Sequence, residues 1–165
     1  MEEEFLKSVN QHQGIIFKVC RMYCSDNADA EDLFQEILLQ LWKSWPNFNQ
    51  NSKISTWMYQ IGLNTAITRL RKNNRKPIHH YLSKADDAIP DAAPERLDIL
   101  FDKELQEAIV ELNKLDKALV MLYLDEKTYK EIAEIMGLSE NNVGVKINRI
   151  KKKLKNKMRV DYGIR

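Results

Sequence analysis

The chain has 165 residues, of which 44% are hydrophobic and 30% charged, enough for one ordinary core or two small ones. No stretch approaches the roughly 18 to 20 apolar residues of a membrane span, and the start Met-Glu-Glu-Glu is the reverse of a basic signal-peptide start. We therefore expect a cytoplasmic protein. With five glycines and no sustained alternation of apolar and polar residues, the expected fold class is all-α.

The net charge of +2 conceals a strong asymmetry along the chain. Residues 139 to 165 carry nine Lys or Arg against two acids, whereas residues 77 to 105 carry seven acids against three bases. Such clustering of positive charge is typical of proteins that bind nucleic acid. The alternative is a solvated basic helix end, because most charge runs do nothing more specific.

Two cysteines, Cys20 and Cys24, lie four residues apart on a predicted helix. This spacing allows a shared metal or a redox pair, but no further cysteine completes a zinc set, and His12 is a poor fourth ligand. We interpret them as ordinary buried or half-buried thiols, and we expect neither a metal nor a cofactor.

The clearest helix of the first half runs from Asp26 to Trp45, with acids in its first turn and one wide apolar face. That face consists of Ala30, Leu33, Phe34, Ile37, Leu38, Leu41, Trp42 and Trp45. A second face, partly outside the first, consists of Asp32, Gln35, Glu36 and Leu39. Acids and an amide around an exposed leucine can form a protein-docking patch, although a solvated face is the usual explanation.

A polar loop, Asn47 to Ser55, leads to a helix that starts at Thr56 with aromatic residues and ends with cations. The residues of interest are Trp57, Arg69, Arg71 and Lys72. Rings interleaved with cations suit single-stranded nucleic acid, because bases stack on rings at roughly 1 to 3 kcal/mol each while phosphates follow the charge. From the pattern alone, Trp57 is more often a core residue than a stacking platform.

Prolines and acids then mark a joint between Asn73 and about Arg96. Pro77, Pro90 and Pro94 fall among acidic and small residues, a composition that does not support a packed helix. The sequence thus predicts two small helical domains, at residues 1–74 and 100–165, joined by a flexible acidic linker at residues 75–99.

The second domain contains a helix-turn-helix pattern. Thr128 can cap the first helix while Glu131 reaches back to it, and its apolar stripe is Ile132, Ile135 and Met136. Gly137 permits a left-handed turn, after which Ser139 can cap the second helix. The buried stripe of that second helix consists of Val143, Ile147, Ile150 and Leu154.

This stripe determines which residues of the second helix face outward. They are Asn141, Val145, Asn148, Arg149 and Lys152, with Asn142, Lys146 and Lys153 on one flank. Asparagine can pair with adenine, arginine with guanine and valine with a thymine methyl group, while lysine neutralises phosphate. The pattern therefore favours a helix that reads duplex DNA.

Three motifs follow one another along the chain: Asp29-Ala-Glu-Asp-Leu-Phe-Gln-Glu36 with Leu41-Trp42, Ser55-Thr-Trp-Met-Tyr-Gln-Ile61 with Asn64-Thr-Ala66, and Tyr129-Lys-Glu-Ile-Ala-Glu-Ile135 with Ser139 and Val143. In this order, split by a variable joint, they resemble the extracytoplasmic-function (ECF) sigma factors of bacterial RNA polymerase. The resemblance covers nearly the whole chain and is far more specific than a lone helix-turn-helix.

The resemblance implies that residues 1–74 form a region 2-like domain, which binds core polymerase and the minus-ten element. Residues 100–165 would form a region 4-like domain, which binds the minus-thirty-five element. Asn64 matches a position that lines a pocket for a flipped minus-ten base, and the loop from Asn47 to Ser55 would help to hold that base. The minus-ten residues so implied are Trp57, Asn64, Arg69, Arg71 and Lys72, and those for core polymerase are Asp32, Gln35, Glu36 and Leu39. The minus-thirty-five residues are Asn141, Asn142, Val145, Lys146, Arg149 and Lys152.

The implied partners are core RNA polymerase, promoter DNA as duplex and as melted non-template strand, and an anti-sigma factor, often membrane-bound. No small-molecule substrate is implied. Two positions depart from the family pattern: Gly144 stands where relatives commonly carry a lysine or another long polar residue, and Asn49-Gln50 replaces an arginine-glycine pair in the minus-ten loop.

The alternative function is a stand-alone transcriptional regulator that binds duplex DNA through the helix-turn-helix without polymerase. An enzyme is not expected, because the chain has no glycine-rich phosphate loop and no Ser-His-Asp or Cys-His arrangement that can be placed.

Overall fold

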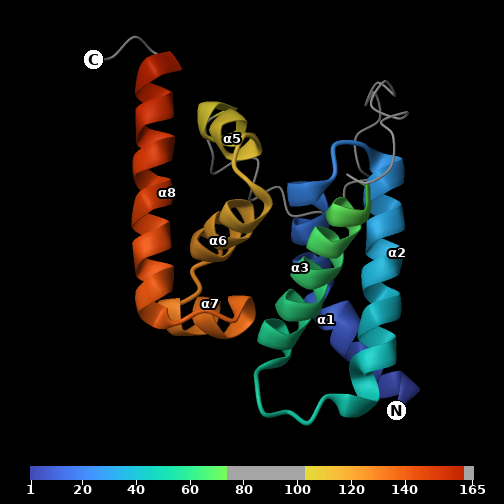
Figure 1. The fold of residues 1–165 in the computed structure, drawn as a ribbon. Coiled ribbons are helices and arrows are strands. Elements are labelled where there is room, and N and C mark those ends of the chain that lie inside the picture. Colours follow the sequence, from blue (N-terminus) through green and yellow to red (C-terminus); the bar gives the residue numbers. More distant parts are fainter. Residues whose placement is uncertain (74–102, 162–165) are drawn as a thin grey trace. The chain divides into compact units, whose positions relative to one another are not determined.

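The structure is a computed structural model that describes residues 1–73 and 103–161. Within these ranges every regular element is a helix, which confirms the all-α fold (Figure 1). The described helices fall into two compact units, α1 to α3 and α5 to α8. The linker predicted at residues 75–99 lies outside the described residues, and the predicted domain boundaries stay a prediction. None of the helices in these ranges is long and apolar enough to cross a membrane.

The first unit consists of α1 (Glu2–Tyr23), α2 (Asn27–Ser44), a short 3-10 helix η1 (Trp45–Asn47) and α3 (Ile54–Asn73). Each of the three α-helices packs against the other two, as their bundle in Figure 1 shows. Their apolar stripes meet in a core that includes Ile16, Leu33, Ile37, Leu41, Met58 and Tyr59, all at most 1% exposed.

The helix predicted from Asp26 to Trp45 is present, with both ends shifted by one residue. Asp26 is the N-cap, and its side chain accepts the backbone N–H of Asp29 at 2.8 Å. Trp45 begins η1, since Pro46 has no N–H to continue the α-helix. Trp42, predicted on the apolar face, is 43% exposed. Its ring centre lies 5.0 Å from that of Phe5 on α1, so Trp42 contacts the core side of α2 but stays partly exposed.

The second unit consists of α5 (Lys103–Val110), α6 (Lys114–Leu124), α7 (Tyr129–Met136) and α8 (Glu140–Asp161). The long helix α8 packs against each of the other three. Helix α6 lies in the middle of this unit, and five consecutive residues of it are buried: Ala118, Leu119, Val120, Met121 and Leu122.

The helix-turn-helix predicted from the sequence is confirmed in α7 and α8. Thr128 and Glu131 form a reciprocal capping box at the start of α7. Gly137 ends α7 in the left-handed conformation with φ 67°, which a side chain would strain. Ser139 Oγ then accepts the backbone N–H of Asn142 at 3.1 Å at the start of α8. Every residue of the predicted stripes is buried or half-buried.

Candidate nucleic-acid and polymerase interfaces

Helix α8 presents the predicted DNA-reading residues to solvent. Val143, Ile147 and Ile150 are at most 3% exposed against the rest of the unit, and this burial turns the opposite face outward. That face carries the exposed residues Asn141, Asn142, Val145, Asn148, Arg149 and Lys152, with Lys146 half-buried at its edge. Val145 is 50% exposed, which is unusual for a β-branched apolar residue without a partner. The geometry thus provides the readout face, while the role of each residue in DNA binding stays a prediction.

Three cations of α8 instead contact residues elsewhere in the second unit. Lys153 Nζ lies 3.6 Å from Asp116, and Lys157 forms an ion pair with Glu111. Lys151 Nζ lies 4.4 Å above the ring centre of Tyr123, whose hydroxyl group raises the pKa of this lysine. Lys146, Arg149 and Lys152 form no ion pair with the described residues. Some cations of α8 therefore stabilise the packing of the second unit, while others form a cationic face that is open to solvent.

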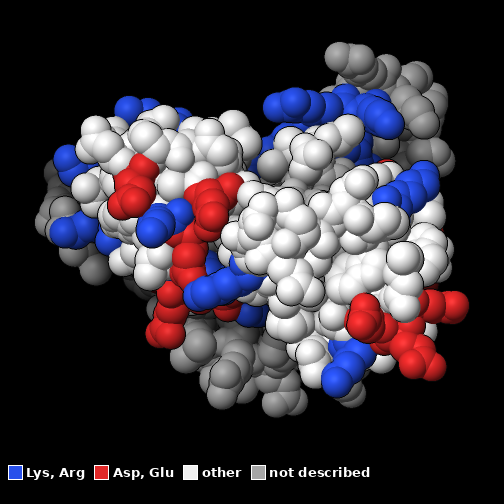
Figure 2. All heavy atoms as spheres, turned by 90° about the horizontal axis from the view of Figure 1, so that it is seen from below, with Lys and Arg blue, Asp and Glu red and all other residues white. Residues whose placement is uncertain are grey.

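Helix α2 exposes its second predicted face. Asp32, Gln35 and Leu39 are exposed, and Glu36 has a side chain that is 43% exposed. Leu39 is itself 50% exposed, at a position where the opposite side of the helix is fully buried. An exposed leucine among acids and an amide is a surface suited to a protein partner. Figure 2 shows acidic, basic and uncharged side chains on one face of the molecule.

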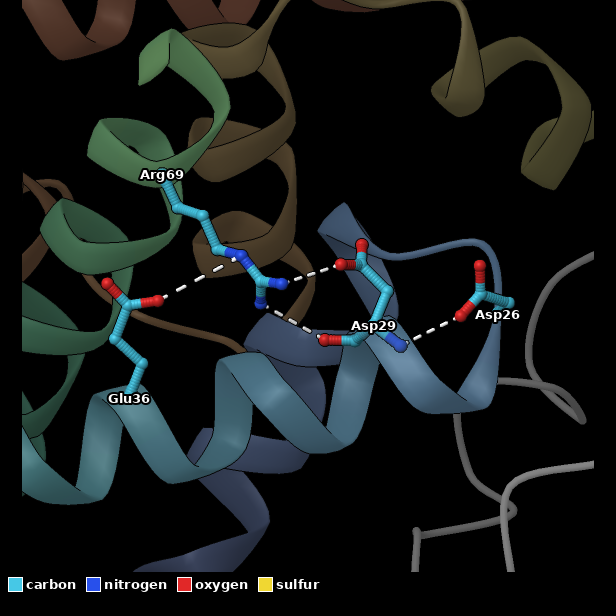
Figure 3. A network of polar contacts seen from close by, with 4 residues as sticks. All are labelled: Asp26, Asp29, Glu36 and Arg69. Atoms are coloured by element: carbon cyan, nitrogen blue, oxygen red, sulfur yellow. Dashed lines mark hydrogen bonds and ion pairs between the residues drawn. The ribbon is translucent and has the colours of Figure 1, made fainter. Parts of the chain in front are cut away.

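Helix α3 carries the residues predicted for the minus-ten site. Asn64, Arg71 and Lys72 are exposed on it. Arg69 is different, because its side chain is only 19% exposed and its guanidinium reaches the first turn of α2. Arg69 Nη2 donates to Asp29 Oδ1 at 2.7 Å, Nη1 donates to the Asp29 carbonyl oxygen at 3.1 Å, and Nε lies 3.9 Å from Glu36 (Figure 3). Arg69 is thus engaged within the first unit in this structure.

Trp57 belongs to an aromatic cluster at the start of α3. Its ring lies 4.7 Å from that of Phe48 and 5.8 Å from that of Trp45, which is itself 5.7 Å from Phe48. Trp57 is half-buried, so a part of the indole stays accessible. The cluster ties the loop after η1 to α3, and packing is therefore one role of Trp57 that the structure demonstrates.

Comparison with protein families assigns both units. Residues 9–76 match the model of "Sigma-70 region 2", and residues 102–154 match that of "Sigma-70, region 4". Together the two matches cover most of the chain in the order that the motifs predict. The chain belongs to the ECF sigma factors of the sigma-70 family. It is thus an RNA polymerase sigma factor that functions in transcription initiation.

Two relatives of this sigma factor match it over most of their own length. The "ECF RNA polymerase sigma factor SigW" of Bacillus subtilis is 27% identical, with 96% of this chain and 90% of the relative covered. The "ECF RNA polymerase sigma-E factor" of Haemophilus influenzae is 26% identical over 91% of this chain and 85% of the relative.

Solved structures share the fold. The sigma factor RpoE from Bartonella quintana, crystallised with the anti-sigma factor NepR, matches with a TM-score of 0.67 at 19% identity and 97% coverage of both chains. CnrH in complex with the cytosolic domain of CnrY matches with a TM-score of 0.70 at 18% identity, covering 98% of this chain and 91% of that one. The alternative of a stand-alone regulator explains the second unit only, whereas the region 2 match accounts for the first.

The two cysteines of this sigma factor are free thiols near the Arg69 network. Cys20 is buried and Cys24 half-buried. Burial raises the pKa of Cys20 to about 12, and burial together with the neighbouring Asp29 carboxylate raises the pKa of Cys24. Among the described residues, no group of three His, Cys, Asp or Glu is arranged to hold a metal ion. Raised pKa values are the opposite of what reactive, redox-sensing thiols require.

Proposed function

We propose that this sigma factor docks on core RNA polymerase through the exposed face of α2, and that α3 and α8 read the two promoter elements. The observation that carries the proposal is that the residues predicted to bind are exposed on helices within the two family matches. Asp32, Gln35 and Leu39 are exposed on α2, within the region 2 match. Asn141, Asn142 and Arg149 are exposed on α8, within the region 4 match.

At the minus-ten element, α3 would bind the melted non-template strand. Asn64 is a side chain with donor and acceptor groups, exposed two turns after the aromatic cluster, where an unstacked base can be hydrogen-bonded. Flipping a base costs a few kcal/mol, which pocket contacts and stacking offset. The accessible part of Trp57 and the exposed Arg71 and Lys72 would supply stacking and phosphate contacts.

At the minus-thirty-five element, α8 would enter the major groove with its N-terminal half. Asn141, Asn142 and Arg149 carry the donors that recognise adenine and guanine edges, and Val145 suits a thymine methyl group. Lys146 and Lys152 would contact phosphate, so we expect binding of this element to weaken steeply as salt rises.

We place the protein in the cytoplasm, and we assign it neither a catalytic role nor a cofactor nor a small-molecule substrate.

Two structures of similar fold are complexes with an anti-sigma factor, NepR, and with the cytosolic domain of CnrY. We propose by analogy that an anti-sigma protein holds this factor inactive by covering its DNA-facing surfaces.

The test is run-off transcription with purified bacterial core polymerase on DNA selected for binding to the reconstituted holoenzyme, with and without this protein. We expect specific transcripts that depend on the protein, together with a stable complex with core. If the folded protein neither binds core nor supports transcription, yet binds duplex DNA tightly alone, the stand-alone regulator replaces this proposal.

A further inference from the structure

Arg69 lies near the end of α3, but its two hydrogen bonds go to Asp29 on α2, 40 positions earlier in the chain. Its guanidinium donates two hydrogen bonds to the first turn of α2, one to the carboxylate of Asp29 at 2.7 Å and one to the carbonyl oxygen of Asp29 at 3.1 Å. Asp29 also donates its backbone N–H to the capping side chain of Asp26 at 2.8 Å (Figure 3). One side chain thus organises the start of the helix that carries the proposed docking face.

The same guanidinium reaches the proposed docking face itself. Arg69 Nε lies 3.9 Å from a carboxylate oxygen of Glu36, which stands two turns further along α2 than Asp29. Figure 3 shows the arginine between the two acids, above the helix. The side chain of Arg69 is 19% exposed, whereas those of Asp29 and Glu36 are 41% and 43% exposed. The arginine is therefore the inner member of the group, and it limits where the Glu36 carboxylate can lie.

We infer that Arg69 is a positioning residue for the polymerase-binding face of α2, where it holds Glu36 and the first helical turn in place, and that it is not a DNA ligand. The inference rests on the proposed function of that face. It also divides the cations at the end of α3 into two classes. Arg71 and Lys72 are exposed and remain the phosphate contacts.

The geometry of the contacts supports this division. Charge-assisted hydrogen bonds from a guanidinium fork are stronger than neutral ones, and a partly buried pair is less screened by water and salt than an exposed pair. To reach a phosphate, Arg69 would have to release both bonds to Asp29 and leave that carboxylate without its cationic partner. Arg71 and Lys72 reach DNA without such a loss.

The experiment measures competition of purified variants with the parent protein for core polymerase. We expect Arg69→Ala and Arg69→Lys each to weaken core binding by at least about threefold, since lysine keeps the charge but not the bidentate fork. Thr68→Ala, at an exposed neighbouring position, is the matched control and should compete like the parent. Circular dichroism establishes that each variant is folded at the assay temperature, and Arg69→Lys decides the matter if Arg69→Ala is not folded.

A double-mutant cycle with Glu36→Gln separates positioning from general stability. If Arg69 acts through Glu36, the combined variant should lose less core affinity than the two single losses predict together. A merely structural arginine would give additive losses.

The salt dependence of holoenzyme binding to forked promoter DNA is the second readout, measured with core saturated. Arg69→Ala should leave its slope unchanged, whereas Arg71→Ala should reduce it by roughly one contact. Unaltered core competition by Arg69→Lys, additive losses in the cycle, or a reduced salt slope for Arg69→Ala would each overturn the inference. Failure of the parent protein itself to bind core would instead overturn the proposed function.

Discussion

The ring of Tyr129 lies against Gly144, with Cε2 3.4 Å and Cδ2 3.7 Å from the point where a β-carbon on residue 144 would stand. This contact joins the two helices of the DNA-binding motif. The ring of Tyr129 occupies the space beside residue 144 into which a side chain would extend. A single methyl group would make ordinary van der Waals contact with the ring, whereas a longer side chain would have to displace it. Tyr129 is 37% exposed, so its ring can shift by a small amount.

We therefore predict that Gly144→Ala stabilises the second unit by up to about 1 kcal/mol, the usual gain from replacing a glycine in a helix interior. Thermal and denaturant unfolding measure the change. Gly137→Ala is the matched control and should destabilise the unit, because residue 137 has φ 67°. A loss of stability on Gly144→Ala would show that the Tyr129 ring cannot yield.

Asn64→Ala should impair promoter melting without harming the fold. The position is exposed on α3, and alanine is a better helix former than asparagine. Loss of the base contacts should reduce open-complex formation by about tenfold or more, as expected for hydrogen bonds worth about 1.5 kcal/mol. Permanganate footprinting of melted thymines is the measurement, with Gln13→Ala at an exposed position of α1 as a control. Equal melting by Asn64→Ala and the parent would remove Asn64 from the minus-ten site.

Asp32→Lys should weaken core binding, because it reverses a charge on the proposed docking face. Glu3→Lys is the matched control, since Glu3 is an exposed acid on α1 and lies outside that face of α2. We expect competition for core to fall several-fold for the first variant and little for the second. Equal effects of the two variants would mean that only net charge matters.

Arg149→Ala distinguishes base reading from phosphate contact at the minus-thirty-five element. If Arg149 reads a base, the variant should lose roughly 1 to 3 kcal/mol on the selected promoter and discriminate less at one position. If it contacts phosphate only, binding should weaken equally on all sequences. Competition among single-base variants of the promoter measures the difference.

The thiols of Cys20 and Cys24 should resist alkylation in the native protein near neutral pH. Burial raises the pKa of Cys20 to about 12 and also raises that of Cys24, so that almost no thiolate is present. Iodoacetamide followed by mass spectrometry should modify both residues rapidly in denaturant and slowly without it. Fast modification of the native protein would contradict the buried environment.

The same two pKa values predict how stability changes in alkali. A thiol whose pKa is raised in the folded state keeps its proton there to a higher pH than in the unfolded chain. Its contribution to stability is complete below the ordinary thiol pKa near 9.0 and is lost as pH rises toward the raised folded values. Cys20→Ala should therefore reduce the fall in unfolding free energy above pH 9.0.

Local signals in the sequence predicted the DNA-binding motif well. The capping box of Thr128 and Glu131, the left-handed Gly137 and the buried stripe of α8 each depend on residues within one or two turns of one another. For the same reason the exposed faces of α2 and α8 could be predicted from helical periodicity alone.

Features that depend on distant contacts were not predictable in this way. The bond from Arg69 to Asp29 spans 40 positions, so the sequence around Arg69 shows the neighbouring cations but not this contact. Trp42 was assigned to the apolar face, and its own helix does not reveal how much of its ring the neighbouring α1 leaves exposed. Helix α6 was not predicted as a separate helix. Residues 118–122 are all buried, and a continuous apolar run shows no helical period.

The aromatic cluster around Phe48 gives the protein an intrinsic optical reporter. All three tryptophans, Trp42, Trp45 and Trp57, belong to the first unit, and residues 95–165 contain none. Trp45 and Trp57 both contact Phe48 in the loop beside the proposed base-binding site. Tryptophan emission should thus follow unfolding of the first unit alone and respond when a single strand enters, with no dye attached, while the second unit stays silent.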